Sequence, residues 1–112
     1  MNVLVIEPLK EPYEKEISGN LKSLQDLVGG LIEVIYPFDD AVALICNEEG
    51  KLLGLPLNRA LYDENGEIYD IISGTFILCS APPDSESFKG LSVEQMQKYM
   101  KKFKHIEIYF RR

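Results

Sequence analysis

The sequence predicts an α+β fold, with a mainly antiparallel sheet of five or six strands and two helices packed on it. Two stretches, residues 18–29 and 92–104, carry apolar side chains at helical spacing. Short apolar runs typical of buried strands lie at 3–6, 41–46 and 75–79. The 112 residues are 46% hydrophobic and 27% charged, which suits one hydrophobic core. We therefore expect residues 1–112 to form a single domain, since a second typical domain would need a longer chain.

The first half of the chain predicts four strands. The apolar run at 3–6 ends at Glu7-Pro8 and reads as a buried strand. Residues 13–17 alternate weakly, and their charges suit an edge strand. Residues 31–36 form the next predicted strand. Residues 41–46 are apolar on both faces, which favours a central position in the sheet.

The first helix is predicted at 18–29. Ser18 has a side chain suited to the N-cap position. Gly29-Gly30 is typical of a left-handed helix end. One apolar face is expected from Leu21, Leu24, Leu27 and Val28.

Turn signals organise the middle of the chain. Residues 47–50 have the composition of a hairpin loop, so residues 51–55 are expected to return as a strand. Residues 57–62 are ambiguous between a helical turn and a strand. Residues 67–72 and 75–79 read as strands separated by Ser73-Gly74.

The second helix has the strongest local signature. Ser92 and Gln95 match a capping box, and Leu91 can pack against Met96 as a hydrophobic staple. A last strand is expected at 106–110, so that residues 88–112 comprise a basic helix and a C-terminal strand. The predicted apolar stripe of the helix consists of Val93, Met96, Met100 and Phe103.

The charge is unevenly distributed. The formal net charge is −6, made up of −11 over residues 1–88 and +5 over residues 89–112. An acidic body repels phosphate backbones, so nucleic acid is disfavoured as a partner. The basic residues 89–112 either contact an anionic partner or pack against the acidic body of their own chain.

The residue types argue against catalysis and against a metal centre. Cys46, Cys79 and His105 are too few for a four-ligand zinc site, and no cofactor is expected. Both cysteines lie in apolar segments, which indicates buried, reduced thiols, although neighbouring strands could bring them together as a disulfide. His105 has no evident nucleophile or orienting acid nearby in sequence, so we expect that the protein is not an enzyme.

One segment suggests a ligand site. Arg59 stands among acidic neighbours, and a guanidinium suits a carboxylate or phosphate. Asn58 beside it adds an amide donor and acceptor. The alternative is an internal salt bridge from Arg59 to an acidic side chain, Asp63 or Asp70. The candidate anion-binding set is Asn58, Arg59, Gly74 and Thr75.

Membrane segments are not expected. No apolar run approaches the roughly 20 residues that a membrane span needs. The first residues lack the basic start and long apolar stretch of a signal peptide. We therefore expect a cytoplasmic protein without membrane contact.

Several strings resemble the domain of unknown function 3846 family. They are Val5-Ile6-Glu7-Pro8, Leu27 to Val34, Asn47 to Lys51, Leu55 to Leu61 and Ile71 to Phe76. The resemblance covers roughly residues 2–80, and the ending 106–112 resembles nothing in it. The family has no established activity, and the resemblance implies only a setting in bacteria, their phages and mobile elements.

Together these observations favour a small non-catalytic binding protein of phage or mobile-element origin. It would act by docking its acidic surface to a protein partner, as a monomer or a homodimer. The alternative is a domain that binds a small nucleotide-like anion through Asn58 and Arg59.

Overall fold

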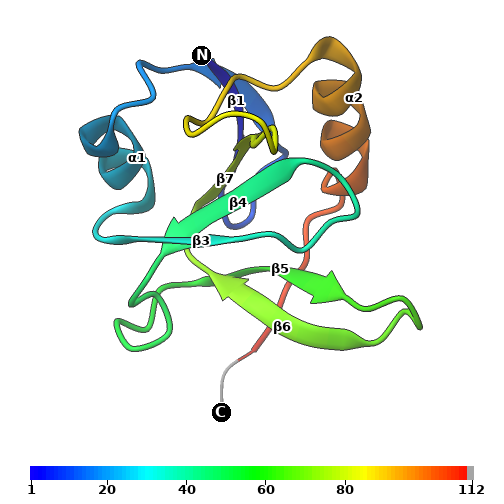
Figure 1. Ribbon diagram of the computed structural model, residues 1–112. Coiled ribbons are helices and arrows are strands. Elements are labelled where there is room, and N and C mark those ends of the chain that lie inside the picture. Colours follow the sequence, from blue (N-terminus) through cyan, green and yellow to red (C-terminus); the bar gives the residue numbers. More distant parts are fainter. Residues whose placement is uncertain (111–112) are drawn as a thin grey trace.

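The computed structural model describes residues 1–110, which contain two helices and seven strands (Figure 1). The strands are β1 (Asn2–Ile6), β2 (Tyr13–Glu16), β3 (Ile32–Ile35), β4 (Val42–Asn47), β5 (Leu57–Tyr62), β6 (Ile68–Ser73) and β7 (Phe76–Ser80), and the helices are α1 (Leu21–Val28) and α2 (Val93–Lys102). The ambiguous segment 57–62 is thus a strand. This arrangement confirms the predicted α+β single domain.

Five strands form one antiparallel sheet in the order β2-β1-β7-β4-β3. The charged strand β2 lies at one edge, as predicted, and β3 lies at the other. Among the described residues, strands β5 and β6 pair only with each other and form a separate ribbon, in which the register shifts twice. Figure 1 shows this ribbon below the larger sheet.

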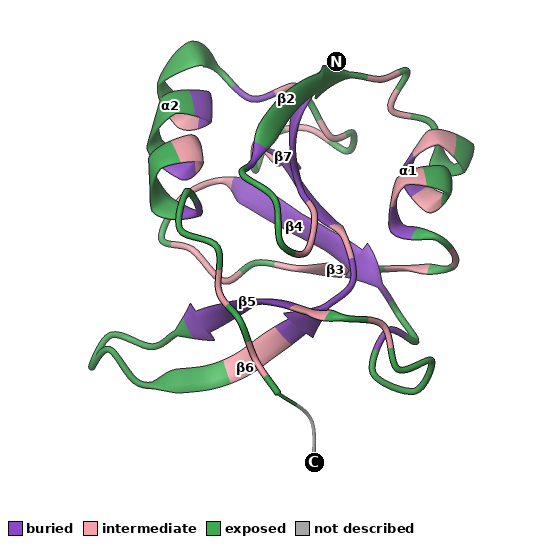
Figure 2. Ribbon diagram, turned by 180° about the vertical axis from the view of Figure 1, so that it is seen from behind, coloured by how far each residue is buried: buried purple, intermediate pink, exposed green. Residues whose placement is uncertain are grey.

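The larger sheet is covered on both faces, which explains its continuous apolar runs. Alternate residues of β1, β4 and β7 point to opposite faces. On one face, residues such as Val3 and Ile45 pack with Leu24 and Val28 of α1. The other face packs with α2 and with side chains of the β5–β6 ribbon. The burial colours in Figure 2 show the central strands between these layers.

Helix α1 is shorter than predicted. Asn20, rather than Ser18, is the N-cap, and its side chain accepts a hydrogen bond from the Ser23 N–H. Gly19 has a φ of +86°, a left-handed conformation that keeps the preceding residues out of the helix. Gly29 ends the helix at φ +81°, as predicted. Leu21, expected on the apolar face, is 57% exposed because it begins the helix on its outer side.

Helix α2 has the predicted capping box. The Ser92 side chain accepts from the Gln95 N–H, and the Gln95 side chain accepts from the Ser92 N–H. Leu91 and Met96 both belong to the core cluster under α2, as the predicted staple requires. Val93 is 74% exposed, so it does not belong to the buried stripe.

The predicted strand at 51–55 is wrong. Residues 48–54 instead form consecutive turns, in which the Leu53 N–H donates to the Glu49 carbonyl. Gly54, at φ +67°, reverses the chain. The reason lies in the sheet, since β3 and β7 already occupy both sides of β4. A returning strand beside β4 has no free edge to pair with.

The predicted last strand at 106–110 is wrong as well. These residues carry no strand pairing, and burial alternates along them: Glu107 and Tyr109 are half-buried, whereas their neighbours are exposed. Glu107 offers its side chain to the Ala60 N–H of β5, at 3.1 Å. A carboxylate therefore takes the place on β5 that a backbone carbonyl of a paired strand would occupy.

Within the described part of the chain, both helices fall short of the length and apolar character needed to cross a membrane.

Candidate functional site

Asn58 and Arg59, the predicted anion-binding pair, lie buried at the centre of a polar network. Both residues are 0% exposed. The Asn58 amide nitrogen donates to the carbonyls of Ile6 and Gly74, each at 2.9 Å. Its Oδ1 accepts from Arg59 Nη1 at 2.9 Å. Asn58 thus links β5 to the end of β1 and to the turn between β6 and β7.

The Arg59 guanidinium is directed at carbonyl groups of the protein itself. Nε and Nη2 donate to the Phe103 carbonyl at 3.2 and 3.0 Å, and Nη2 also donates to the Lys10 carbonyl at 2.8 Å. Phe103 is the C-cap of α2, so a positive charge lies at the negative end of the helix dipole. Burial lowers the pKa of Arg59, while the nearby Glu107 carboxylate raises it.

The predicted salt bridge of Arg59 is not formed with either acidic candidate. Among the described residues, Asp70 pairs with Lys51, and Asp63 caps its own turn by accepting from the N–H groups of Asn65 and Glu67. Arg59 is instead balanced by carbonyl oxygens and by the field of Glu107.

Gly74 and Thr75 flank the network without completing an open site. Gly74 is buried at φ +83°, and its N–H donates to the Pro56 carbonyl at 2.7 Å. A Cβ atom there would lie 2.8 Å from Leu55 Cδ1. Thr75 is half-buried. The Gly74 carbonyl therefore accepts a hydrogen bond from Asn58, while the Gly74 N–H donates to the Pro56 carbonyl.

The cysteines are reduced and poorly suited to nucleophilic chemistry. Both are free and buried. Burial, reinforced by Glu33 and Asp70, raises the pKa of Cys46 to about 11. Burial raises the pKa of Cys79 to about 12. A thiolate is the reactive form, so these thiols stay protonated and inert at neutral pH.

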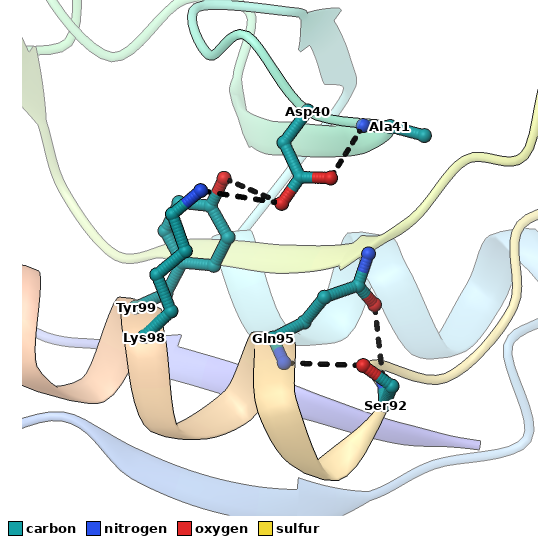
Figure 3. A network of polar contacts seen from close by, with 6 residues as sticks. All are labelled: Asp40, Ala41, Ser92, Gln95, Lys98 and Tyr99. Atoms are coloured by element: carbon teal, nitrogen blue, oxygen red, sulfur yellow. Dashed lines mark hydrogen bonds and ion pairs between the residues drawn. The ribbon is translucent and has the colours of Figure 1, made fainter.

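An acidic network ties the turn before β4 to α2 (Figure 3). Asp40 Oδ2 accepts from the Tyr99 hydroxyl at 3.1 Å and lies 3.6 Å from Lys98 Nζ. Its Oδ1 accepts from the Ala41 N–H at 2.9 Å. Burial and the hydrogen bond to Asp40 raise the pKa of Tyr99 above its ordinary value. This carboxylate is used in packing the helix on the sheet.

A groove next to this network is lined by residues of both charges. Lys98 and Lys102 of α2 line its wall, and the aromatic rings of Phe38, Tyr62 and Tyr69 contribute to it. Three carboxylates share the same lining: Asp39, Asp63 and Glu64. Acidic side chains outnumber the two lysines, and Lys98 is already paired, so the groove does not favour a phosphate-like anion.

A depression of about 240 Å³ collects carboxylates at the β3 edge of the molecule. Glu33 of β3, Glu48 of the turn after β4 and Asp70 of β6 line it, with Lys51 paired to Asp70. Leu52 lies on its rim and is 87% exposed. We call this feature the acidic depression. Sequence reasoning missed it, because its three carboxylates come from separate elements.

The described residues hold no group of three or more His, Cys, Asp or Glu side chains arranged to bind a metal ion. The carboxylates of the acidic depression are therefore spread along its wall. Such an arrangement can attract cationic side chains of another protein at several points.

The family model described as "Domain of unknown function (DUF3846)" matches residues 1–104. The chain belongs to this family. The DUF3846 match includes the buried network, the acidic depression and α2, and it leaves residues 105–112 outside. No curated protein and no solved structure matches the chain. Membership of DUF3846 confirms the predicted resemblance and assigns no activity.

Proposed function

We propose that this DUF3846 protein is a non-catalytic binding protein that docks its acidic depression on a basic, partly apolar surface of a protein partner. A setting in a phage or mobile element is part of this proposal and is supported by the family resemblance alone. The observation that carries the proposal is the combination of carboxylates and an exposed leucine in one depression.

Charge supports docking at this place. Glu33 and Glu48 are exposed, and both belong to the strongly negative region 1–88 of the sequence. Complementary charge raises the rate of association and selects among partners. A lysine or arginine of the partner would find several carboxylate oxygens in the acidic depression.

Apolar surface supports a protein as the partner. Leu52 and Leu53, consecutive in the turn after β4, are 87% and 60% exposed. Leu31, whose carbonyl accepts from the Glu48 N–H, is 54% exposed. Exposed apolar side chains gathered beside charged ones are typical of protein interaction sites. A small inorganic cation would make no use of them.

The chemistry of the depression favours recognition over catalysis. Cys46 lines it, but burial, and after it the carboxylates around the thiol, raise the pKa of Cys46 and oppose formation of the thiolate nucleophile. The same carboxylates attract a positive charge from outside. The negative field of these carboxylates favours binding of a cationic surface, and the same field disfavours the thiolate that nucleophilic catalysis would need.

Affinity capture with matched charge variants tests the proposal. The tagged chain is incubated with lysate of a bacterium that carries the gene, and bound proteins are identified by mass spectrometry. The variant Glu33→Lys/Glu48→Lys should lose the partner. The control Glu14→Lys/Glu16→Lys makes the same charge change on β2, at the opposite edge of the sheet, and should retain it.

Two results would contradict the proposal. One is recovery of the same proteins by both double variants, which would place binding elsewhere. The other is repeated recovery of no partner by the wild-type chain. Leu52→Ser provides an independent variant, because an 87% exposed leucine contributes little to folding and should weaken capture by itself.

Binding of a nucleotide-like anion by Asn58 and Arg59 stays a prediction that their buried contacts do not favour. A thermal-shift panel of nucleotides discriminates, because a saturating ligand raises stability by RT ln(1 + [L]/Kd). A shift that disappears in Arg59→Lys would support that alternative. An unchanged melting temperature across the panel would remove it.

A further inference from the structure

The segment after α2 presents an apolar stripe to solvent. Ile106, Ile108 and Phe110 are 42%, 67% and 90% exposed. Glu107 and Tyr109, between them, are half-buried and turn inward. We call residues 104–110 the C-terminal segment. Over residues 106–110, Glu107 and Tyr109 face the protein and the apolar side chains that alternate with them face outward, the reverse of the usual arrangement.

Inward contacts hold the C-terminal segment in this orientation. Glu107 Oε1 accepts from the Ala60 N–H of β5 and from the Tyr109 hydroxyl. Tyr62 also interacts with Tyr109, and burial together with Glu107 raises the pKa of Tyr109. Because the inward positions are fixed by hydrogen bonds, alternation keeps the apolar side chains on the outer side.

The apolar stripe continues onto the body of the protein. A hollow of about 340 Å³ beside the segment is lined by Ile108 and Phe110 together with Leu9 and Leu57. Leu9 is itself 62% exposed. A contiguous apolar surface of this kind marks an interaction site more often than scattered single residues do.

The charges around the stripe are basic. Lys101, Lys102 and Lys104 precede it and are exposed. The next two residues in the sequence are Arg111 and Arg112. The stripe therefore combines apolar side chains with positive charge, whereas the acidic depression combines the exposed Leu52 with negative charge. One chain carries both halves of a complementary contact.

We propose that the C-terminal segment of one copy docks on the acidic depression of a second copy of this chain. The inference rests on the proposed function, since it names a partner for that depression. Two different surfaces meet. The contact is either made twice in a dimer with twofold symmetry, or made once per pair of copies and continued head-to-tail into longer assemblies.

Complementation between two variants tests the contact directly. Ile108→Ser/Phe110→Ser removes the stripe and keeps the depression. Glu33→Lys/Glu48→Lys removes the depression and keeps the stripe. All four side chains are exposed, so both variants should fold, which circular dichroism checks.

Multi-angle light scattering and sedimentation measure the self-association of each protein and the complex formed by the mixture. The wild-type chain should self-associate, and each variant alone should do so at least about tenfold more weakly. An equimolar mixture of the two variants should form a 1:1 complex, since one supplies the stripe and the other the depression. Raising the salt from about 0.1 to 1 M should weaken this complex, because the screening length falls from roughly 10 to 3 Å.

Matched controls separate this contact from general effects. Leu21→Ser removes a 57% exposed leucine from α1, on the opposite face of the sheet, and should associate like the wild type. Glu14→Lys/Glu16→Lys should do the same. The inference is overturned by a monomeric wild type at about 100 μM, well above a micromolar dissociation constant, or by variants that do not complement each other.

Failure of this inference is distinguishable from failure of the proposed function. If the wild type is monomeric and the stripe variant still captures a foreign protein that the depression variant loses, the second copy is excluded as the partner while the depression keeps its function. If neither variant alters capture or self-association, both proposals fail.

Discussion

Replacing Arg59 with methionine should strongly destabilise this protein, because it removes donors while their acceptors stay buried. The guanidinium donates hydrogen bonds to the Phe103 carbonyl, to Asn58 Oδ1 and to the Lys10 carbonyl. Methionine fills a comparable apolar volume, so the loss of hydrogen bonds dominates. A buried ion pair can be replaced by apolar residues at little cost, but here the carbonyl partners remain.

The magnitude follows from the burial of those acceptors. Asn58 is 0% and Phe103 4% exposed, so water does not readily replace the lost donors at either residue. Each unsatisfied buried acceptor costs about 1–3 kcal/mol, which makes about 2–6 kcal/mol for the two. The Lys10 carbonyl is half-buried and adds less. Domains of this kind have a total stability of roughly 5–15 kcal/mol.

Urea and thermal unfolding followed by circular dichroism measure the effect. At about 4 °C per kcal/mol, the melting temperature of Arg59→Met should fall by roughly 8–24 °C. Lys22→Met is the control, because its ion pair with Asp26 is exposed and surface pairs contribute about 0.3–0.5 kcal/mol. A variant Arg59→Met that melts within about 2 °C of the wild type would refute the structural role of this residue.

Four further predictions rest on local features of the structure. Ser92→Ala should lower the free energy of unfolding by about 1 kcal/mol through loss of the capping box; an unchanged urea midpoint would contradict it. Gly74→Ala should destabilise more than Gly66→Ala: both have positive φ, but only at Gly74 would the new Cβ meet a leucine methyl at 2.8 Å, and equal midpoints would argue otherwise. Iodoacetamide should not label Cys46 or Cys79 at pH 8 unless the chain unfolds, and rapid labelling of the folded protein would show that the thiols are accessible. Because folding raises these pKa values from 9.0 to about 11 and 12, the free energy of unfolding should be unaffected below about pH 9 and fall from there toward pH 12.

Local signals in the sequence correctly predicted the start of α2 and the end of α1. The capping box joins residues three positions apart, and Gly29 ends α1 within its own turn. Such interactions are complete within one or two turns of the chain, so neighbouring residues are enough to identify them. Residues 18–20 were assigned to α1 because the left-handed conformation of Gly19 has no unique sequence signal.

Pairing between strands was predicted less well for a physical reason. The turn at 47–50 was recognised, but whether residues 51–55 return as a strand depends on which edge of β4 is free. Neither edge is free, because β3 pairs along one edge of β4 and β7 along the other, where Ile77 pairs with Ile45. The local composition predicts the turn, but it carries no information about the distant strand whose pairing with β4 excludes a hairpin.

What the sequence alone determined is a set of short-range properties. These are two amphipathic helices with the capping box of α2 and the glycine end of α1, apolar strands for a two-sided core, and the separation of an acidic body from a basic end. The tertiary structure decided how the charged side chains are used. Arg59 donates to the carbonyl of Phe103, 44 residues away, and Glu33, Glu48 and Asp70 line one depression. A charge acts on whatever the fold places within a few ångströms, and that neighbourhood depends on chain segments remote in sequence.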